Sequence, residues 1–442
     1  MVDRLIRNCD ALLYKGKYPE FVLKQDIAIE GSTIKEIGDT GTIKVSPETE
    51  IIEANGMLAI PGLINTHAHV PMVLMRNLAE DVSIASWFND YIWPMESNLT
   101  AEDVYWGAML GIAEMIENGV TCVADHYFYM DEVAKAVQES GMRANLVWAI
   151  FSHEGEEKIE DTAEFIDRWQ GGADGRITTW FGPHSPYTCT PEYLELVAAK
   201  AKQKDVGIHI HVSETHSQVE LALKDFKKTP VQVCYDAGVM DVPTIFAHCR
   251  FPQEVDFPLL AKSGTGIPQA PKTYMKHAET IAPVNQYFEH GVNVGMATDG
   301  AVSNNTMDIL EQVGLLGMAA KFKMNDATFL PAEQLIDVAF RGSAKVIRQE
   351  DQIGELKAGM KADIALLKQD GVHMTPRTNM LSYLAYNARG SDVNTVLCDG
   401  KVIMRDRKLL NMDTDRIRTE VQNRVHRLSK INPNNRIAVY PA

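Results

Sequence analysis

Eight short apolar runs separated by helical stretches constrain the fold of this 442-residue chain more than any other feature. Such alternation is typical of parallel strands joined by crossover helices. Eight strands can close into a (β/α)8 barrel, of the kind found in triosephosphate isomerase, and an open doubly wound sheet is the alternative at this count. The runs span residues 58–66, 121–125, 143–150, 177–183, 207–212, 244–248, 264–268 and 292–299. We therefore predict an α/β fold built around a barrel.

The two ends of the chain carry a different pattern, in which short β-branched runs alternate with glycine and proline. This pattern covers residues 1–58 and returns at 362–367 and 393–403, where Asp399 and Gly400 form a hairpin signal. We expect both ends to build one small β domain together. The predicted division is 1–58 for its first part, 59–350 for the barrel, and 351–442 for its second part. The last part includes an amphipathic C-terminal helix, over 413–430, packed outside the barrel.

Composition limits the classes of molecule that the protein is expected to bind. The 43 basic and 59 acidic residues give a net charge of −16, which provides none of the cationic surface that binds a phosphate backbone. No stretch approaches the roughly 20 apolar residues of a membrane span, and the N-terminus lacks the apolar run of a signal peptide. The six scattered cysteines contain no Cys-x-x-Cys pair and fit reduced thiols. We expect a cytoplasmic protein that binds neither nucleic acid nor membrane.

Histidines and carboxylates gather at the ends of the predicted barrel strands. Active sites of barrel enzymes lie at the C-terminal ends of the strands. The residues in question are His67, His69, His184, His209, His211, Glu214, His248 and Asp299. A closed barrel would bring them into one cavity.

His67 and His69 are two positions apart, so in an extended strand both imidazoles leave the same face and can bind one ion. That spacing alone also suits two histidines at a polar strand end, but His211 and Asp299 at other strand ends favour a metal site. Three imidazoles and one carboxylate suit Zn²⁺, with Fe²⁺ or Mn²⁺ as alternatives. His209 shares a face with His211 but lies further from the strand end, so we interpret it as an interior histidine.

Two further residues are placed to move protons. Glu214 follows the fifth run, where it can stand beside a metal-activated water, although acids are also common in the first turn of a helix. His248 ends the sixth run, and the alternative for it is a core histidine bonded to backbone. Residues 177–184 contain no lysine of the kind that bridges two metals in related sites. We expect one divalent metal.

Taken together, these motifs resemble the amidohydrolase superfamily, in particular its 5'-methylthioadenosine/S-adenosylhomocysteine deaminase and chlorohydrolase group. The resemblance runs from about residue 5 to about residue 430. The matching segments are 61–69, 183–188, 209–215, 247–249 and 297–305. The resemblance implies a (β/α)8 barrel with a small β-sandwich formed by both chain ends, and assembly into a homo-oligomer.

The same resemblance implies roles for single residues. The implied metal ligands are His67, His69, His211 and Asp299. In such deaminases the ion, expected to be zinc, supplies the water that attacks C6 of adenine, and a bound divalent ion can lower the pKa of water to about 7. Glu214 would carry a proton to ring N1, while His248 and Asp299 would activate the water and help ammonia leave. Glu96 would hold the ribose hydroxyls, and His184 and Glu214 would contact the nucleoside together with Asp299.

Three departures from the family pattern bear on the substrate. Arg250 and Phe251 follow His248-Cys249 where the family has Val-His, and Ala270, Thr273 and Tyr274 change the segment after the seventh strand. An arginine that adenosyl-specific members carry after the third strand is missing from residues 151–157. We predict a hydrolytic deaminase of 5'-methylthioadenosine or S-adenosylhomocysteine that releases ammonia and the inosyl product. The alternatives are an aminohydrolase or chlorohydrolase of a pterin, guanine or s-triazine, and a non-catalytic metal-dependent binding protein.

Overall fold

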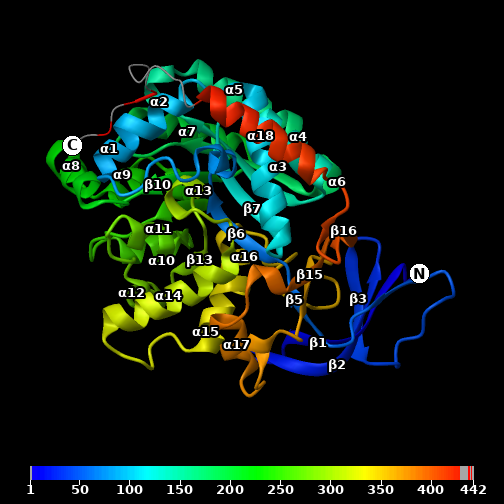
Figure 1. Ribbon diagram of the computed structural model, residues 1–442. Helices are drawn as coiled ribbons and strands as arrows, with labels where there is room; N and C mark the ends of the chain where they lie inside the picture. The colour runs from blue at the N-terminus through cyan, green and yellow to red at the C-terminus, as the bar shows by residue number, and fades with distance from the viewer. Residues whose placement is uncertain (1, 429–436, 439, 441–442) are drawn as a thin grey trace.

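The computed structural model describes residues 2–428, 437–438 and 440, and it contains an eight-stranded parallel barrel beside a β-sheet domain (Figure 1). The barrel strands are β6 (Leu63–Ala68), β7 (Val120–Tyr127), β8 (Arg143–Ile150), β9 (Ile177–Pro183), β10 (Ile208–Val212), β11 (Thr244–His248), β12 (Gly266–Gln269) and β13 (Asn293–Met296). They neighbour one another in chain order. A doubly wound sheet reverses its strand order at a switch point, so this order excludes that alternative and confirms the barrel.

Helices follow the barrel strands and surround them (Figure 1). The main ones are α3 (Ala101–Glu117), α4 (Met130–Ser140), α5 (Glu157–Trp169), α7 (Pro191–Lys204), α8 (His216–Phe226), α9 (Pro230–Asp236), α10 (Phe257–Ser263), α12 (Val284–His290) and α14 (Ile309–Met324). Local sequence sets where several begin. Thr100 and Asp103 form a capping box at the start of α3, and Thr190 caps α7 directly before Pro191.

The barrel closes between β13 and β6 through individual bonds. In the described part of the chain, the ladder pairs run continuously from β6 to β13 and none joins these two strands. Asn65 instead bonds Thr298 twice: its Oδ1 accepts from the Thr298 N–H at 3.1 Å, and its Nδ2 donates to the Thr298 hydroxyl at 2.7 Å. The Asp299 N–H also donates to the His67 carbonyl at 3.1 Å. The seam therefore places His67 beside Asp299.

Both ends of the chain build one β domain, as predicted, and its strands form a single nine-stranded sheet. Its path runs β17, β16, β15, β14, β5, β1, β2, β3, and β4 pairs with β1. The bounds are β1 (Arg4–Tyr14), β2 (Pro19–Glu30), β3 (Thr33–Asp39), β4 (Glu50–Glu53), β5 (Met57–Pro61), β14 (Ile364–Lys368), β15 (Val393–Cys398), β16 (Lys401–Arg405) and β17 (Lys408–Leu409). The sheet has its own cluster of buried apolar side chains, so it forms a separate domain.

The single barrel strand expected over residues 58–66 is wrong, because this run is two strands. β5 pairs antiparallel with β14 in the β domain, whereas β6 pairs with β7 in the barrel. Gly62 separates them, and a Cβ at this position would lie 2.1 Å from the Thr121 hydroxyl. Only glycine fits so close an approach, which lets the chain pass from one sheet to the other.

The predicted C-terminal helix is α18 (Thr414–Leu428), and positions 429 and 430 of the prediction lie outside the described residues. It packs against α3. Arg424 forms an ion pair with Glu102 at 2.5 Å, and Arg427 pairs with Asp103. These contacts hold α18 outside the barrel.

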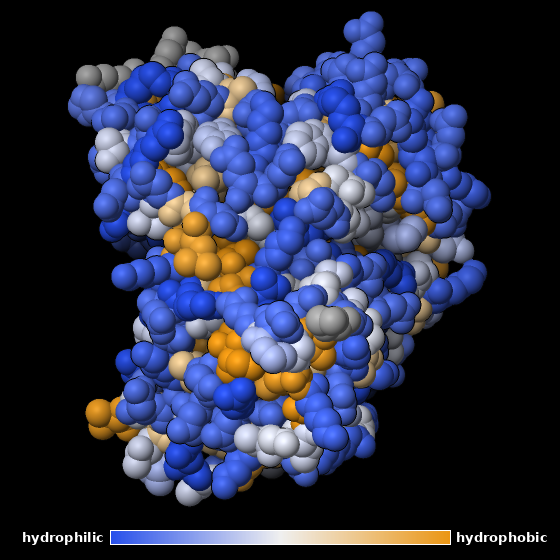
Figure 2. Space-filling model, turned by 90° about the vertical axis from the view of Figure 1, so that its right-hand side faces the viewer, coloured by the Kyte–Doolittle hydropathy of each residue, from blue (hydrophilic) through white to orange (hydrophobic). Residues whose placement is uncertain are grey.

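The surface on the β-domain side is mainly hydrophilic, with smaller apolar areas near its middle (Figure 2). Among the described residues, every helix is too short or too polar to span a membrane. All six cysteines are buried, and none forms a disulfide.

A buried ion pair joins the two domains. Arg143, at the start of β8, is 1% exposed. Its Nε lies 2.9 Å from Asp363 Oδ2, and its Nη2 lies 3.1 Å from Asp399 Oδ1. Both aspartates belong to the β domain, at the ends of β14 and β15. Arg143 therefore pairs with the β domain. It does not replace the arginine that adenosyl-specific members of the family carry after the third strand.

Arg143→Met should destabilise the protein by about 3–5 kcal/mol, because it leaves buried Asp363 without its cation and leaves Asp399 with Lys361 alone. Urea unfolding followed by circular dichroism measures the change. Lys401→Met is the matched control, since Lys401 pairs with Asp174 in an exposed position and such pairs contribute about 0–1 kcal/mol. Equal shifts in the two variants would contradict a structural role for the buried pair.

Candidate active site

A cavity of about 670 Å³, open to solvent, lies at the C-terminal ends of the barrel strands. Seven of the residues predicted for the site line it: His69, Glu96, His184, His211, Glu214, His248 and Asp299. The eighth, His67, is fully buried and contacts Asp299. The structure thus brings together every residue that the sequence placed in the site. Their individual roles stay predictions.

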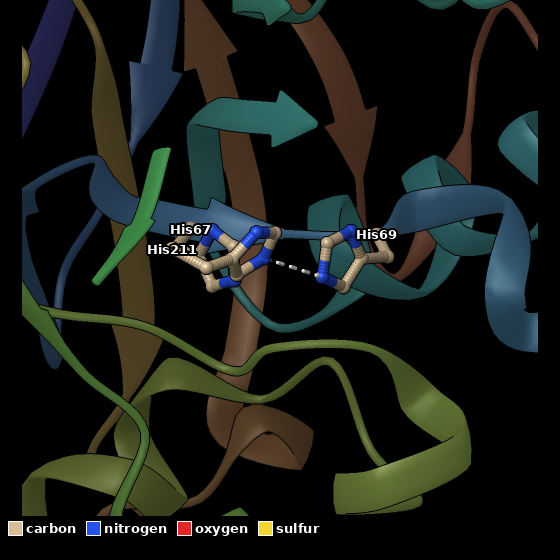
Figure 3. Close-up of side chains that lie close together, drawn as sticks. All are labelled: His67, His69 and His211. Atoms are coloured by element: carbon tan, nitrogen blue, oxygen red, sulfur yellow. Dashed lines mark hydrogen bonds between the residues drawn. The ribbon is translucent and has the colours of Figure 1, made fainter. Parts of the chain in front are cut away.

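Four ligand atoms converge at one point of the cavity wall. Asp299 Oδ1 lies 3.5 Å from His67 Nε2 and 3.4 Å from His69 Nε2. His211 Nε2 lies 3.4 Å from His69 Nε2, as the dashed line in Figure 3 shows. Ligands at about 2.0–2.1 Å from a tetrahedral zinc are separated by roughly 3.3–3.4 Å. These three separations are close to the edges of such a tetrahedron.

Outer hydrogen bonds set which nitrogen of each ring faces the centre. His69 Nδ1 donates to the His126 carbonyl at 2.6 Å, and His211 Nδ1 donates to the His184 carbonyl at 2.8 Å. A carbonyl only accepts, so both Nδ1 atoms carry the proton and both Nε2 atoms are bare in the neutral rings. The two Nε2 atoms therefore point their lone pairs at each other.

The protonation states also suit a metal. Burial lowers the pKa of His67 well below its usual range, and burial lowers that of His211 to about 3. Burial alone would raise the pKa of Asp299, but its hydrogen bond to His67 and the nearby histidines hold it well below the usual value. Neutral imidazoles and an ionised carboxylate are the forms that bind a cation. The residues present thus fit a divalent ion.

The ends of β11 and β13 turn sharply to present their side chains. His248 and Asp299 adopt left-handed backbone conformations, with φ of 70° and 65°. Such conformations are uncommon outside glycine and cluster at functional sites. The Ser303 hydroxyl donates to Asp299 Oδ2 at 2.8 Å. Asp299 is therefore oriented with Oδ1 toward the histidines and Oδ2 toward Ser303.

Glu214 and His248 lie next to each other in the cavity wall. Glu214 Oε1 lies 3.8 Å from His248 Nε2. Gln218 holds Glu214 from behind, with its Nε2 3.3 Å from Glu214 Oε2 and its Oε1 accepting from the Glu214 N–H at 2.9 Å. Although burial alone would raise it, the neighbouring His248, His211 and Arg250 keep the pKa of Glu214 below its usual value. This carboxylate is placed to exchange protons with a bound molecule.

The departures from the family pattern lie around His248. The Tyr274 hydroxyl lies 3.3 Å from His248 Nδ1 and accepts from the Ala270 N–H at 3.1 Å. The guanidinium of Arg250 lies 4.8 Å from the centre of the Tyr274 ring. Thr273 lines the cavity. The changed segment therefore supports His248 from behind and reaches the cavity directly through Thr273.

One wall of the cavity is a segment between β6 and α3, which we name the lid segment. It comprises α1 (Ile84–Ser86), η2 (Trp87–Ile92) and α2 (Trp93–Glu96). Six of its residues line the cavity: Ile84, Trp87, Phe88, Ile92, Trp93 and Glu96. Burial raises the pKa of Glu96 to about 8, an effect that the Tyr127 hydroxyl partly opposes. The wall is aromatic, with a single carboxyl group.

Sequence reasoning missed two kinds of cavity residue. His126, at the end of β7, lines the cavity and holds His69 through its carbonyl. It follows Asp125 at the end of a predicted strand, so the rule that identified the other histidines also applies to it. Trp87 and Phe88 line the lid wall, and their short helical turns carry no local signal for a binding site.

Comparisons with known proteins agree with this geometry. Residues 58–403 match the sequence profile of the amidohydrolase family. A relative from Caldanaerobacter subterraneus subsp. tengcongensis, named 5-methylthioadenosine/S-adenosylhomocysteine deaminase, is 41% identical over 433 residues, covering 97% of this chain and 99% of the relative. A protein of the same name from Pelotomaculum thermopropionicum is 40% identical over 435 residues, with the same coverage. An adenosine deaminase structure from Xanthomonas campestris with bound zinc has a TM-score of 0.92 at 28% identity, covering 97% and 99% of the two chains.

His209→Ala should weaken metal affinity about 10- to 100-fold, the usual effect of losing an outer partner of a ligand. His67 Nδ1 lies 2.9 Å from His209 Nε2, so the variant removes the group that orients this ligand. Competition with a chelator, followed by metal analysis, measures the affinity. His209→Gln, which keeps an acceptor, should recover part of it, and the exposed His290→Ala should match wild type. Wild-type affinity in His209→Ala would contradict the orienting role.

Glu96→Gln should stabilise the protein increasingly as pH rises from about 4.5 to about 8, the usual and the raised pKa of Glu96. In that range the unfolded carboxyl is ionised while the buried one resists ionisation, so wild-type stability falls with pH. The gain should be small at pH 4.5 and on the order of a few kcal/mol at pH 8. Urea titrations across this range measure it, with the exposed Glu289→Gln as control. A gain independent of pH would contradict the raised pKa.

Proposed function

The chain belongs to the amidohydrolase family, and from that premise we propose that it is a zinc-dependent deaminase of 5'-methylthioadenosine or S-adenosylhomocysteine. Water adds at C6 of the adenine ring and the 6-amino group leaves as ammonia, which converts the adenine to hypoxanthine. The observation that carries the proposal is the gathering of the Nε2 atoms of three histidines, His67, His69 and His211, and of Asp299 Oδ1 beside Glu214 and His248. The naming of full-length relatives at about 40% identity supports the substrate class.

The residues divide the proton transfers among them. A divalent ion, when bound, supplies a water molecule of lowered pKa as the nucleophile. Glu214, an ionised carboxylate, takes up one proton of the water and delivers it to ring N1, which makes C6 more electrophilic. His248 and Asp299 take up the second proton and give it to the amino group, which leaves as ammonia. The hydrogen bonds from Gln218 and Ser303 hold Glu214 and Asp299 in place for these transfers.

The cavity suits a nucleoside without phosphate. The aromatic lid wall offers flat apolar surface for a purine, and Glu96 offers a carboxyl group for the ribose hydroxyls. The described residues that line the cavity include no lysine or arginine. A phosphate, or the amino-acid carboxylate of S-adenosylhomocysteine, would therefore find no cationic partner there. We accordingly propose that 5'-methylthioadenosine, whose tail is uncharged, is the better of the two substrates.

A single zinc ion is the proposed cofactor. The four proposed ligand residues lie close together around His67 and His69, and His184 follows β9 with no lysine in residues 177–184. Nitrogen-rich coordination with one carboxylate favours zinc over harder cations. Homo-oligomeric assembly, a cytoplasmic location and the domain boundaries at 58 and 350 stay predictions.

A substrate panel tests the proposal. Ammonia release and the ultraviolet change from adenine to hypoxanthine are measured with 5'-methylthioadenosine, S-adenosylhomocysteine and adenosine, and ammonia or chloride release with guanine, a pterin and a chloro-s-triazine. We expect the highest kcat/KM with 5'-methylthioadenosine. Glu214→Gln should lower kcat about 10²–10⁴-fold with unchanged metal content, because it removes the proton carrier.

Each arm of the panel has a distinct consequence. Turnover of guanine, pterin or triazine alone would replace the substrate class and keep the chemistry. Wild-type protein that holds zinc and binds a nucleoside without turning over any compound would overturn the proposal in favour of a binding protein. A preference for S-adenosylhomocysteine would contradict the argument from the missing cationic lining.

A further inference from the structure

The lid segment, residues 84–96, contacts a residue far away in the chain. The backbone N–H of Tyr440 donates to Asn89 Oδ1 at 2.9 Å, and Asn89 Nδ2 donates to the Tyr440 carbonyl at 3.2 Å. The Tyr440 ring stacks on Phe88, with ring centres 4.8 Å apart and planes 5° apart. Phe88 lines the cavity. One side of Tyr440 is therefore bound to the back of the cavity wall.

The other end of Tyr440 reaches the turn that carries Glu214. Its hydroxyl lies 2.9 Å from the Thr215 hydroxyl and 3.3 Å from the Ser217 hydroxyl. Thr215 follows Glu214 directly and caps α8 by accepting from the Gln218 N–H. Gln218 in turn bonds both the side chain and the backbone of Glu214. A short chain of hydrogen bonds thus connects Tyr440 to the proposed proton carrier.

Tyr440 is also buried to an unusual degree for a tyrosine that lies outside the barrel. It is 2% exposed, and its backbone N–H, its carbonyl and its hydroxyl all have partners. A buried tyrosine removes about 150–250 Å² of surface from water, and its hydroxyl is usually paired. Its contacts fall on two elements that both contribute residues to the cavity lining, the lid segment and the turn after β10.

We propose that Tyr440 is a positioning residue that clasps the lid segment to the Glu214 turn and thereby completes the substrate cavity. The Tyr440 clasp comprises Tyr440, Asn89, Phe88 and Thr215. The ring holds the aromatic wall against the bound molecule, and the hydroxyl holds the turn that aims Glu214. The kinetic consequences rest on the proposed deaminase function, whereas the effect on the lid segment does not.

Two substitutions separate the ring from the hydroxyl. Tyr440→Phe keeps the stack on Phe88 and loses the bond to Thr215, so kcat should fall about 2- to 10-fold, the effect of one neutral hydrogen bond, with KM close to wild type. Tyr440→Ala loses both contacts, so KM should rise as well. Tyr235→Ala, at a half-exposed tyrosine on α9, is the matched control and should leave both constants unchanged.

Hydrogen exchange followed by mass spectrometry tests the clasp without any substrate. Peptides covering residues 84–96 should exchange faster in Tyr440→Ala than in wild type, while peptides from β10 and β11 should not change. Asn89→Ala should also speed exchange, because it removes the two bonds to the backbone of residue 440, which Tyr440→Ala keeps; the double variant should therefore exchange faster than either single one. Metal content should stay at the wild-type value in all variants.

The outcomes separate the clasp from the proposed function. Wild-type exchange in the lid segment together with wild-type kcat and KM in Tyr440→Ala would overturn the clasp and leave the deaminase proposal standing. Faster exchange in a protein that deaminates no compound of the panel would support the clasp and overturn the proposed function. If Tyr440→Ala fails to fold, Tyr440→Phe and Asn89→Ala decide, and wild-type behaviour in both would overturn the clasp.

Discussion

The repulsion among unprotonated ligand atoms is the constraint on which the site depends. His69 and His211 point bare nitrogens at each other at 3.4 Å, and an ionised Asp299 stands beside them. Such an arrangement costs free energy unless a cation offsets it, because the lone pairs and the negative charge are buried together. The backbone carbonyls of His126 and His184 hold the two rings in this orientation. The fold thus places at the strand ends a cluster of side chains that a bound cation would stabilise.

Much of this arrangement was predictable because it follows from short-range rules. Parallel strands separated by helices read directly as a barrel, and polar residues at strand ends then have to share one face of it. The two-residue spacing of His67 and His69 places both on one side of β6. The position of Glu214 after the fifth run already indicated proton transfer, whereas the family resemblance supplied the role of Glu96, and the structure places both in the cavity.

The parts that escaped prediction depend on contacts between distant segments. Residues 58–66 form one apolar run, and the break at Gly62 is visible only when Thr121 lies against it. The hydrogen bond between Asn89 and Tyr440 joins residues 351 positions apart, and the sequence around each residue does not predict it. The aromatic wall of the lid segment is likewise defined by what it faces. His126 is different, because it lies at a strand end, where the rule that identified the other histidines also predicts a site residue.

In the proposed mechanism, metal chemistry and substrate recognition reside in different parts of the molecule. The proposed ligands stand on the barrel strands or in the turns after them, whereas the lid segment and the loop after β12 line the substrate side of the cavity. Tyr274 shows how the substrate side of the cavity can change while the groups around the metal site are kept. It departs from the family pattern, yet its hydroxyl contacts His248 Nδ1 and is itself held by the Ala270 N–H. The substituted residue therefore provides His248 with a partner, so a change in the loop keeps the proton-transfer geometry while it reshapes the cavity around it.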